Sequence, residues 1–125
     1  RALVEAGNRK PSVYLVPLEG TPAEAVERLA REGIQARVVG EGTACVELEE
    51  AGRVVEALTV AAPAIVQDPA ANLVARYADV SSGTVVADDG AAPGGKILAL
   101  PEHPSTLLAA DRSESPALEP GAWVR

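Results

Sequence analysis

The sequence predicts an α+β module followed by the first part of an α/β domain with a Rossmann-like sheet. Residues 12–60 read as a strand, a helix and two further strands, an order typical of a small ferredoxin-like module. Residues 84–111 read as a strand, a glycine-rich turn, a short helix and a second strand, as at the start of a doubly wound sheet. A length of 125 residues allows one small domain and a piece of another.

The clearest local signal of the first module lies in "TPAEAVERLAREG", residues 21–33. Thr21 is placed as a helix N-cap, Pro22 fits the first helical position and Glu24 closes a capping box. Gly33 suits the left-handed residue that follows a helix. The residues that we expect on the apolar stripe of this helix are Val26, Leu29 and Ala30.

Strands are expected on both sides of this helix, at "SVYLVPL" (residues 12–18), "IQARVVG" (34–40) and "TACVELEE" (43–50). These elements form the expected ferredoxin-like module at residues 12–62, which follows a linker at residues 1–11. Residues 51–67 show no clear periodic pattern, apart from a short strand at Ile65 and Val66.

The second part of the chain is expected at residues 63–125 and opens with a helix. Asp68 is placed as its N-cap and Pro69 as its first residue. The residues that we expect on its buried face are Leu73, Val74 and Tyr77.

A glycine-rich turn in "VVADDGAAPGGKILAL" carries the main ligand-binding pattern. Residues 90–96 have the spacing of a phosphate loop, G-x-x-x-x-G-K. However, Ile97 stands where a hydroxyl would bind Mg²⁺, Pro93 has no amide to donate, and Asp88 and Asp89 place negative charge just upstream. The loop therefore favours a ligand with less negative charge than a triphosphate, or one with a sulfonium or ammonium group.

A second strand, "STLLAAD", ends at Asp111, 21 residues after Gly90. In doubly wound sheets an acidic residue about 20 positions beyond the glycine-rich turn accepts hydrogen bonds from ribose hydroxyls. Asp111 is therefore a candidate ribose ligand. The dinucleotide pattern G-x-G-x-x-G is absent, which argues against NAD.

The segments around this loop resemble a known family. "AAPGGK" follows a strand that ends in Asp, "IVQDPAANLVARY" precedes it and "LLAADRS" follows it. Together they are similar to the S-adenosylmethionine-dependent RNA cytosine-5 methyltransferases of the Fmu/Sun family. The resemblance implies that the second part of the chain begins a class I methyltransferase domain.

The resemblance also implies roles for individual residues. The first module would recognise RNA, either ribosomal or transfer RNA, and Asp111 would bind the ribose of the cofactor. The methionine end of S-adenosylmethionine would lie on the loop of Gly90, Ala91, Ala92, Pro93, Gly94, Gly95 and Lys96.

Three positions depart from the family pattern, which usually has Leu-Cys at Asp89 and Gly90 and Thr at Ile97. The catalytic cysteines of the family lie in later strands, whereas Cys45 falls in a strand of the first module. We therefore assign no catalytic residue and expect the chain alone to be inactive. Two interpretations stay open: part of an RNA methyltransferase, or a degenerate, non-catalytic copy that binds RNA or protein.

The expected doubly wound sheet needs more strands than this sequence supplies. Only 14 residues follow Asp111, and they contain Pro116, Pro120 and Gly121, which do not fit a regular helix. We therefore expect the remainder of a methyltransferase domain, or a partner subunit, to complete the sheet.

Charge and composition limit the partners. The net charge is −7, and because Lys and Arg contacts to phosphate supply most RNA affinity, we expect weak RNA binding by this chain alone. One basic group lies at Arg1, Arg9 and Lys10. With one Cys, one His and no apolar run of 18 residues, we expect no metal site, no membrane partner and a cytoplasmic location.

Overall fold

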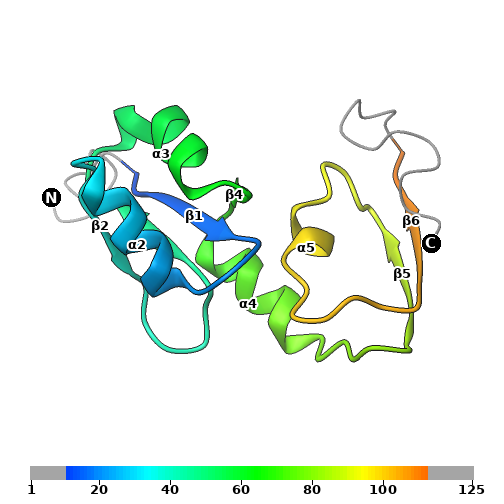
Figure 1. Ribbon diagram of the computed structural model, residues 1–125. Helices are drawn as coiled ribbons and strands as arrows, with labels where there is room; N and C mark the ends of the chain where they lie inside the picture. The colour runs from blue at the N-terminus through cyan, green and yellow to red at the C-terminus, as the bar shows by residue number, and fades with distance from the viewer. Residues whose placement is uncertain (1–10, 113–125) are drawn as a thin grey trace, which may run out of the picture.

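The computed structural model describes residues 11–112 (Figure 1). The basic group at Arg1, Arg9 and Lys10, most of the expected linker and the tail at residues 113–125 lie outside the described residues. The described chain forms a four-stranded antiparallel sheet followed by a two-stranded parallel sheet. Helix α4 (Pro69–Tyr77) lies between the two sheets in the chain and in space.

The first sheet contains the strands β1 (Val13–Pro17), β2 (Ala36–Val38), β3 (Val46–Leu48) and β4 (Ala64–Val66). Their order is β2-β3-β1-β4, and every neighbouring pair is antiparallel. The short strand expected at Ile65 and Val66 is confirmed as part of β4. This strand lies beyond residue 62, where we expected the first module to end.

Two helices connect the strands of this sheet. Helix α2 (Pro22–Arg31) joins β1 to β2, and the 3₁₀ turn η1 (Ala51–Arg53) with helix α3 (Val54–Ala61) joins β3 to β4. Helix α3 had no counterpart among the elements expected from the sequence. The element order is therefore β-α-β-β-α-β.

The predicted ends of α2 are confirmed by its hydrogen bonds. Thr21 Oγ1 accepts from the amide of Glu24 at 3.2 Å, and Glu24 Oε2 accepts from the amide of Thr21 at 2.7 Å. The hydrogen bond from the Thr21 amide to the Glu24 carboxylate is the main cause that lowers the pKa of Glu24 below its ordinary value. Gly33, just past the helix, has a φ of +69°, which glycine adopts without strain.

Substituting Thr21 by Ala is expected to lower the free energy of unfolding by about 1 kcal/mol, because the amide of Glu24 in the first turn of α2 loses the hydroxyl that caps it. Urea unfolding followed by circular dichroism measures this change. Thr59→Ala is the matched control, since the Thr59 hydroxyl only donates to the carbonyl of Val55 within α3. An equal loss in both variants would contradict a specific role of the cap.

The core of the first sheet lies between the strands and helices α2 and α3. Its buried members are Leu15, Ala25, Leu29, Ile34, Val46, Leu48, Ala57 and Ala61. On α2, Leu29 is fully buried as predicted and Val26 packs against the core, but Ala30 is exposed. The prediction for Ala30 was wrong because Ala25 and Leu29, spaced i and i+4, face the sheet.

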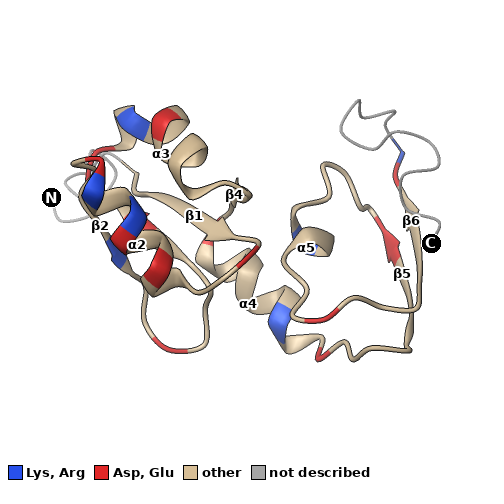
Figure 2. Cartoon of the chain, viewed as in Figure 1, with Lys and Arg blue, Asp and Glu red and all other residues tan. Residues whose placement is uncertain are grey.

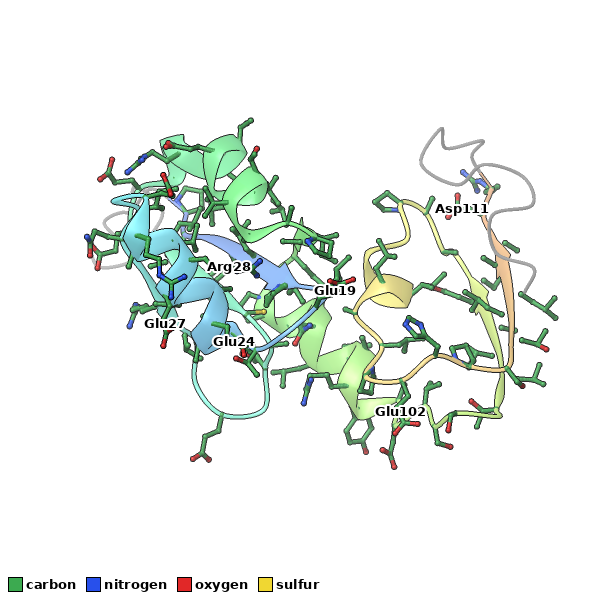
Figure 3. The ribbon with its side chains drawn as sticks, viewed as in Figure 1. Glu19, Glu24, Glu27, Arg28, Glu102 and Asp111 are labelled. Atoms are coloured by element: carbon green, nitrogen blue, oxygen red, sulfur yellow. The ribbon has the colours of Figure 1, made fainter. Side chains whose placement is uncertain are left out.

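Two arginines stabilise the C-terminal ends of α2 and α3 reciprocally. Arg28 of α2, labelled in Figure 3, donates to the carbonyl oxygens of Ala61 and Ala62 at 3.3 Å each. Arg53 precedes α3 and donates to the carbonyl oxygen of Glu32, the C-cap residue of α2, at 3.4 Å and to that of Gly33 at 2.7 Å. Because the last carbonyls of a helix lack intrahelical donors and carry partial negative charge, each guanidinium satisfies the end of the other helix.

The second sheet consists of β5 (Val85–Asp89) and β6 (Thr106–Ala110), which pair in parallel along their full length. The short helix α5 (Gly95–Leu98) lies between them in the chain. Exposure alternates along both strands, and the more open face leaves Val85 68% exposed and Leu108 58% exposed. Parallel sheets are normally covered on both faces. The exposure of Val85 and Leu108 shows that the described residues leave one face of this sheet partly uncovered.

Helix α4 begins as predicted but buries a different face. Asp68 accepts a hydrogen bond from the amide of Ala70 at 2.8 Å, and Pro69 is the first helical residue. We expected Leu73, Val74 and Tyr77 to be buried, but their exposed fractions are 45%, 59% and 92%, respectively. That prediction was wrong because Asn72 and Ala75 form the buried face: a small residue allows close packing, and the amide of Asn72 is hydrogen-bonded.

Candidate cofactor-binding site

The glycine-rich loop and Asp111 meet at the carboxyl ends of β5 and β6. Because these strands are parallel, both end at the same edge of the sheet, where the loop also leaves β5 (Figures 1 and 3). The amides of Gly90 and Ala91 donate to the carbonyl oxygen of Ala110 at 2.7 and 2.9 Å. The amide of Ala92 donates to Asp111 Oδ2 at 3.1 Å. Ligands of doubly wound sheets bind outside this edge.

Two glycines give the loop its path. Gly90 has a φ of +107°, and Gly94, the buried N-cap residue of α5, has a φ of +94°. Both values lie where residues with a side chain are strained. No atom lies within 4 Å of the position that a Cβ on Gly90 would take, so the requirement there is conformational. The loop ends as Gly95 and Lys96 enter α5.

Most amides of the loop are engaged within the chain. Gly90, Ala91 and Ala92 bond to residues at the end of β6, as described above, and Gly94 donates to the carbonyl oxygen of Ala91 at 2.6 Å. Pro93 has no amide proton. A phosphate cradle needs consecutive amides directed at the ligand, and residues 90–94 do not supply them in this conformation.

The charge at this edge of the sheet is mostly negative. Asp88 is half-buried and Asp89 is exposed, and Figure 2 shows them as the acidic end of β5. Their exposures alternate with the strand, in agreement with adjacent residues facing opposite sides. Asp111 adds an exposed carboxylate next to the loop. The arrangement favours a cationic or zwitterionic ligand over a polyanion.

Lys96 belongs to a different surface feature. It lines an apolar groove of about 160 Å³ between α4, β5 and α5, together with Asp88 and with the apolar residues Val74, Val86, Ile97 and Leu100. Ile97 itself is buried, with 7% exposure. The isoleucine that stands in place of a metal-binding hydroxyl therefore acts as a packing residue.

Cys45 lies just before β3 and is fully buried. Burial raises the pKa of its thiol, because a thiolate would lose its hydration there. Nucleophilic catalysis requires the thiolate, so this environment disfavours a catalytic role. Cys45 remains a packing residue of the first module.

Sequence reasoning missed two buried amide side chains beside the loop. Gln67 is 6% exposed and Asn72 is fully buried. Gln67 Nε2 donates to the carbonyl oxygen of Gly95 at 2.8 Å, and Asn72 Nδ2 donates to Gln67 Oε1 at 3.1 Å. Both residues stand in the segment "IVQDPAANLVARY", but nothing in their spacing indicates that they contact each other and the loop.

Residues 11–112 contain no group of three or more His, Cys, Asp or Glu side chains placed to hold a metal ion. Among the helices of this described range, none has the length and apolar character needed to cross a membrane.

No protein-family model matches the sequence, and no curated protein matches it. The residues and geometry of the site therefore carry the functional argument.

Proposed function

We propose that this chain is part of an S-adenosylmethionine-dependent RNA cytosine-C5 methyltransferase acting on ribosomal or transfer RNA. It would carry a ferredoxin-like RNA-recognition module and the first cofactor-binding loop, and it would supply no catalytic cysteine. When bound, S-adenosylmethionine offers an electrophilic methyl group on a sulfonium. The cytoplasmic location expected from the sequence belongs to the same proposal.

The observation that carries the proposal is the hydrogen bond between the amide of Ala92 and Asp111 Oδ2. It joins the glycine-rich loop to the acid at the carboxyl ends of two adjacent parallel strands. These are the two components that a class I methyltransferase site would use for the methionine end and the ribose of the cofactor. A carboxylate accepts several hydrogen bonds at once, so binding a ribose hydroxyl is compatible with the bond to Ala92.

The charge of the site supports the choice of ligand. S-adenosylmethionine carries a sulfonium and an ammonium group, and Asp88, Asp89 and Asp111 give this edge of the sheet negative charge. The same carboxylates would repel a triphosphate, for which the amides of residues 90–94 provide no cradle. A small, cation-bearing nucleoside suits both features.

The topology of the first sheet supports the RNA-recognition part of the proposal. The β-α-β-β-α-β order and the antiparallel strand order β2-β3-β1-β4 are what a ferredoxin-like module requires. With 18 acidic and 11 basic residues in the chain, RNA affinity would have to come from a local basic surface or from a partner. The remainder of the methyltransferase domain, or a partner subunit, would complete the second sheet.

A non-catalytic, degenerate methyltransferase that binds RNA or protein is the second candidate. The specific observation in its favour is that the amides of Gly90, Ala91 and Ala92 already donate to the end of β6 and are not free to bind a cofactor. The uncovered face with Val85 and Leu108 also suits contact with another protein.

Calorimetric titration of S-adenosylmethionine into the full chain tests the proposal, with Mg²⁺-ATP as the comparison ligand. We expect saturable binding of S-adenosylmethionine and no binding of Mg²⁺-ATP, because Ile97 offers no metal ligand. A folded chain that binds neither would favour the degenerate copy. Magnesium-dependent ATP binding would overturn the assignment of the loop.

A further inference from the structure

Gln67 and Asn72 form a continuous series of hydrogen bonds between the two halves of the molecule, and the bond that joins the two side chains is buried. The series starts at the amide of Ala44, which donates to Asn72 Oδ1 at 2.9 Å. Asn72 Nδ2 then donates to Gln67 Oε1 at 3.1 Å, and Gln67 Nε2 donates to the carbonyl oxygen of Gly95 at 2.8 Å. These hydrogen bonds therefore connect the segment before β3 to Gly95, the first residue of α5, where the glycine-rich loop enters the helix.

Because Gln67 and Asn72 are buried, their hydrogen bonds fix the conformations of both side chains. Asn72 is fully buried and Gln67 is 6% exposed, so neither side chain can exchange its protein partners for water without moving. A buried amide group that loses its partner costs its full desolvation free energy. Rotamers of Gln67 or Asn72 that break these bonds are therefore unfavourable. The backbone just after β4 adds a further constraint, because the amide of Gln67 donates to the carbonyl oxygen of Tyr14 in β1 at 3.1 Å.

The hydrogen bonds of Gly90, Ala91 and Ala92 to the end of β6 hold the far end of the loop, whereas the start of α5 has no side-chain cap. Helix α5 has only four residues, and its N-cap residue, Gly94, has no side chain with which to cap it. The carbonyl oxygen of Gly95 accepts hydrogen bonds both from the amide of Ala99, at 3.2 Å within α5, and from Gln67 Nε2. Gln67 therefore anchors the first residue of this short helix to the segment after β4. A rigid sheet and buried amides thus determine where the loop turns into α5.

We propose that Gln67 and Asn72 are positioning residues, which hold the glycine-rich loop at residues 90–96 in register with the first sheet. If the loop binds S-adenosylmethionine, an inference that rests on the proposed function, the two residues set its cofactor affinity without touching the cofactor. The positioning itself does not depend on which ligand the loop takes.

Hydrogen exchange of the full chain tests the positioning without any cofactor. The reporter amides are those of Gly94 and Leu98, which donate to Ala91 and Gly94 within the loop and α5. Gln67→Met keeps the length of the side chain and removes both of its hydrogen bonds. We expect the reporter amides to exchange about fivefold faster, the factor that one net hydrogen bond contributes, while core amides of the first sheet are unchanged.

Two further variants separate positioning from packing. Gln67→Glu keeps an acceptor for Asn72 but, when ionised, has no donor for Gly95, so it should accelerate the same amides. Asn72→Asp should accelerate them in the wild type and add nothing in the Gln67→Met background, because its effect passes through Gln67. The matched control, Gln35→Met at an exposed position, should change none of them.

The outcomes distinguish this inference from the proposed function. Unchanged reporter amides in a folded Gln67→Met protein would overturn the positioning role, whatever the cofactor results. If Gln67→Met accelerates the reporter amides although the wild-type chain binds no S-adenosylmethionine, the positioning role is supported and the proposed cofactor is ruled out. If the wild type binds S-adenosylmethionine, Gln67→Met should weaken that binding several-fold, and an unweakened affinity would overturn the inference.

Discussion

Replacing Asp111 by Ala is expected to weaken S-adenosylmethionine binding about 10- to 100-fold, or to abolish it in a calorimetric titration. Hydrogen bonds to a charged group contribute roughly 1.5 to 3 kcal/mol each, and one such bond to a ribose hydroxyl accounts for this range. The substitution also releases the amide of Ala92, which donates to Asp111 Oδ2 at 3.1 Å. The substitution would therefore remove both the hydrogen bond that holds the loop at Ala92 and the proposed contact to the ribose.

Two control variants divide this effect into its parts. Asp111→Asn keeps an acceptor for the amide of Ala92 but removes the charge, so we expect an affinity between those of the wild type and Asp111→Ala. Glu41→Ala removes an exposed carboxylate between β2 and β3 and should leave the affinity unchanged. Wild-type affinity in Asp111→Ala would show that the cofactor does not use this acid.

Local signals predicted the helix ends well. Thr21, Pro22 and Glu24 interact only with neighbours in sequence, so their pattern was sufficient to place the start of α2. Asp68 and Pro69 did the same for α4. Helix α3 was missed because "VVEALTVA" is rich in β-branched residues, and packing against the first sheet overrides that preference.

Long-range contacts were harder to predict. The two site components could be placed because the 21-residue separation of Gly90 and Asp111 reflects a strand, turn, helix and strand unit. Gln67 and Asn72 could not be placed, because their partners Gly95 and Ala44 each lie 28 residues away and belong to other elements. A polar residue in a helix is normally exposed, so burial of Asn72 depends on contacts that a sequence pattern does not contain.

The two sheets differ in how completely the described residues cover them. The first has a closed core, in which Leu15 and Val46 are buried between strands and helices. The second leaves Val85 and Leu108 exposed on a parallel pair, and a two-stranded sheet is marginal by itself. We therefore infer that the first sheet supplies most of the stability, and that the glycine-rich loop depends on its connection to that sheet.

Replacing Leu29 by Ala is expected to lower the free energy of unfolding by about 2 to 5 kcal/mol, enough to unfold much of a marginally stable protein. Leu29 is fully buried against the first sheet, so truncation removes apolar contacts and leaves a cavity. Urea unfolding followed by far-ultraviolet circular dichroism measures the change.

Leu108→Ala is the matched control, because it removes the same atoms from a leucine that is 58% exposed on β6. We expect its effect on the free energy of unfolding to stay within about 0.5 kcal/mol, as for surface substitutions elsewhere. A loss as large as that of Leu29→Ala would contradict an uncovered second sheet. It would mean that the face with Leu108 is covered in solution, and a concentration-dependent unfolding midpoint would then identify a second copy of the chain as the cover.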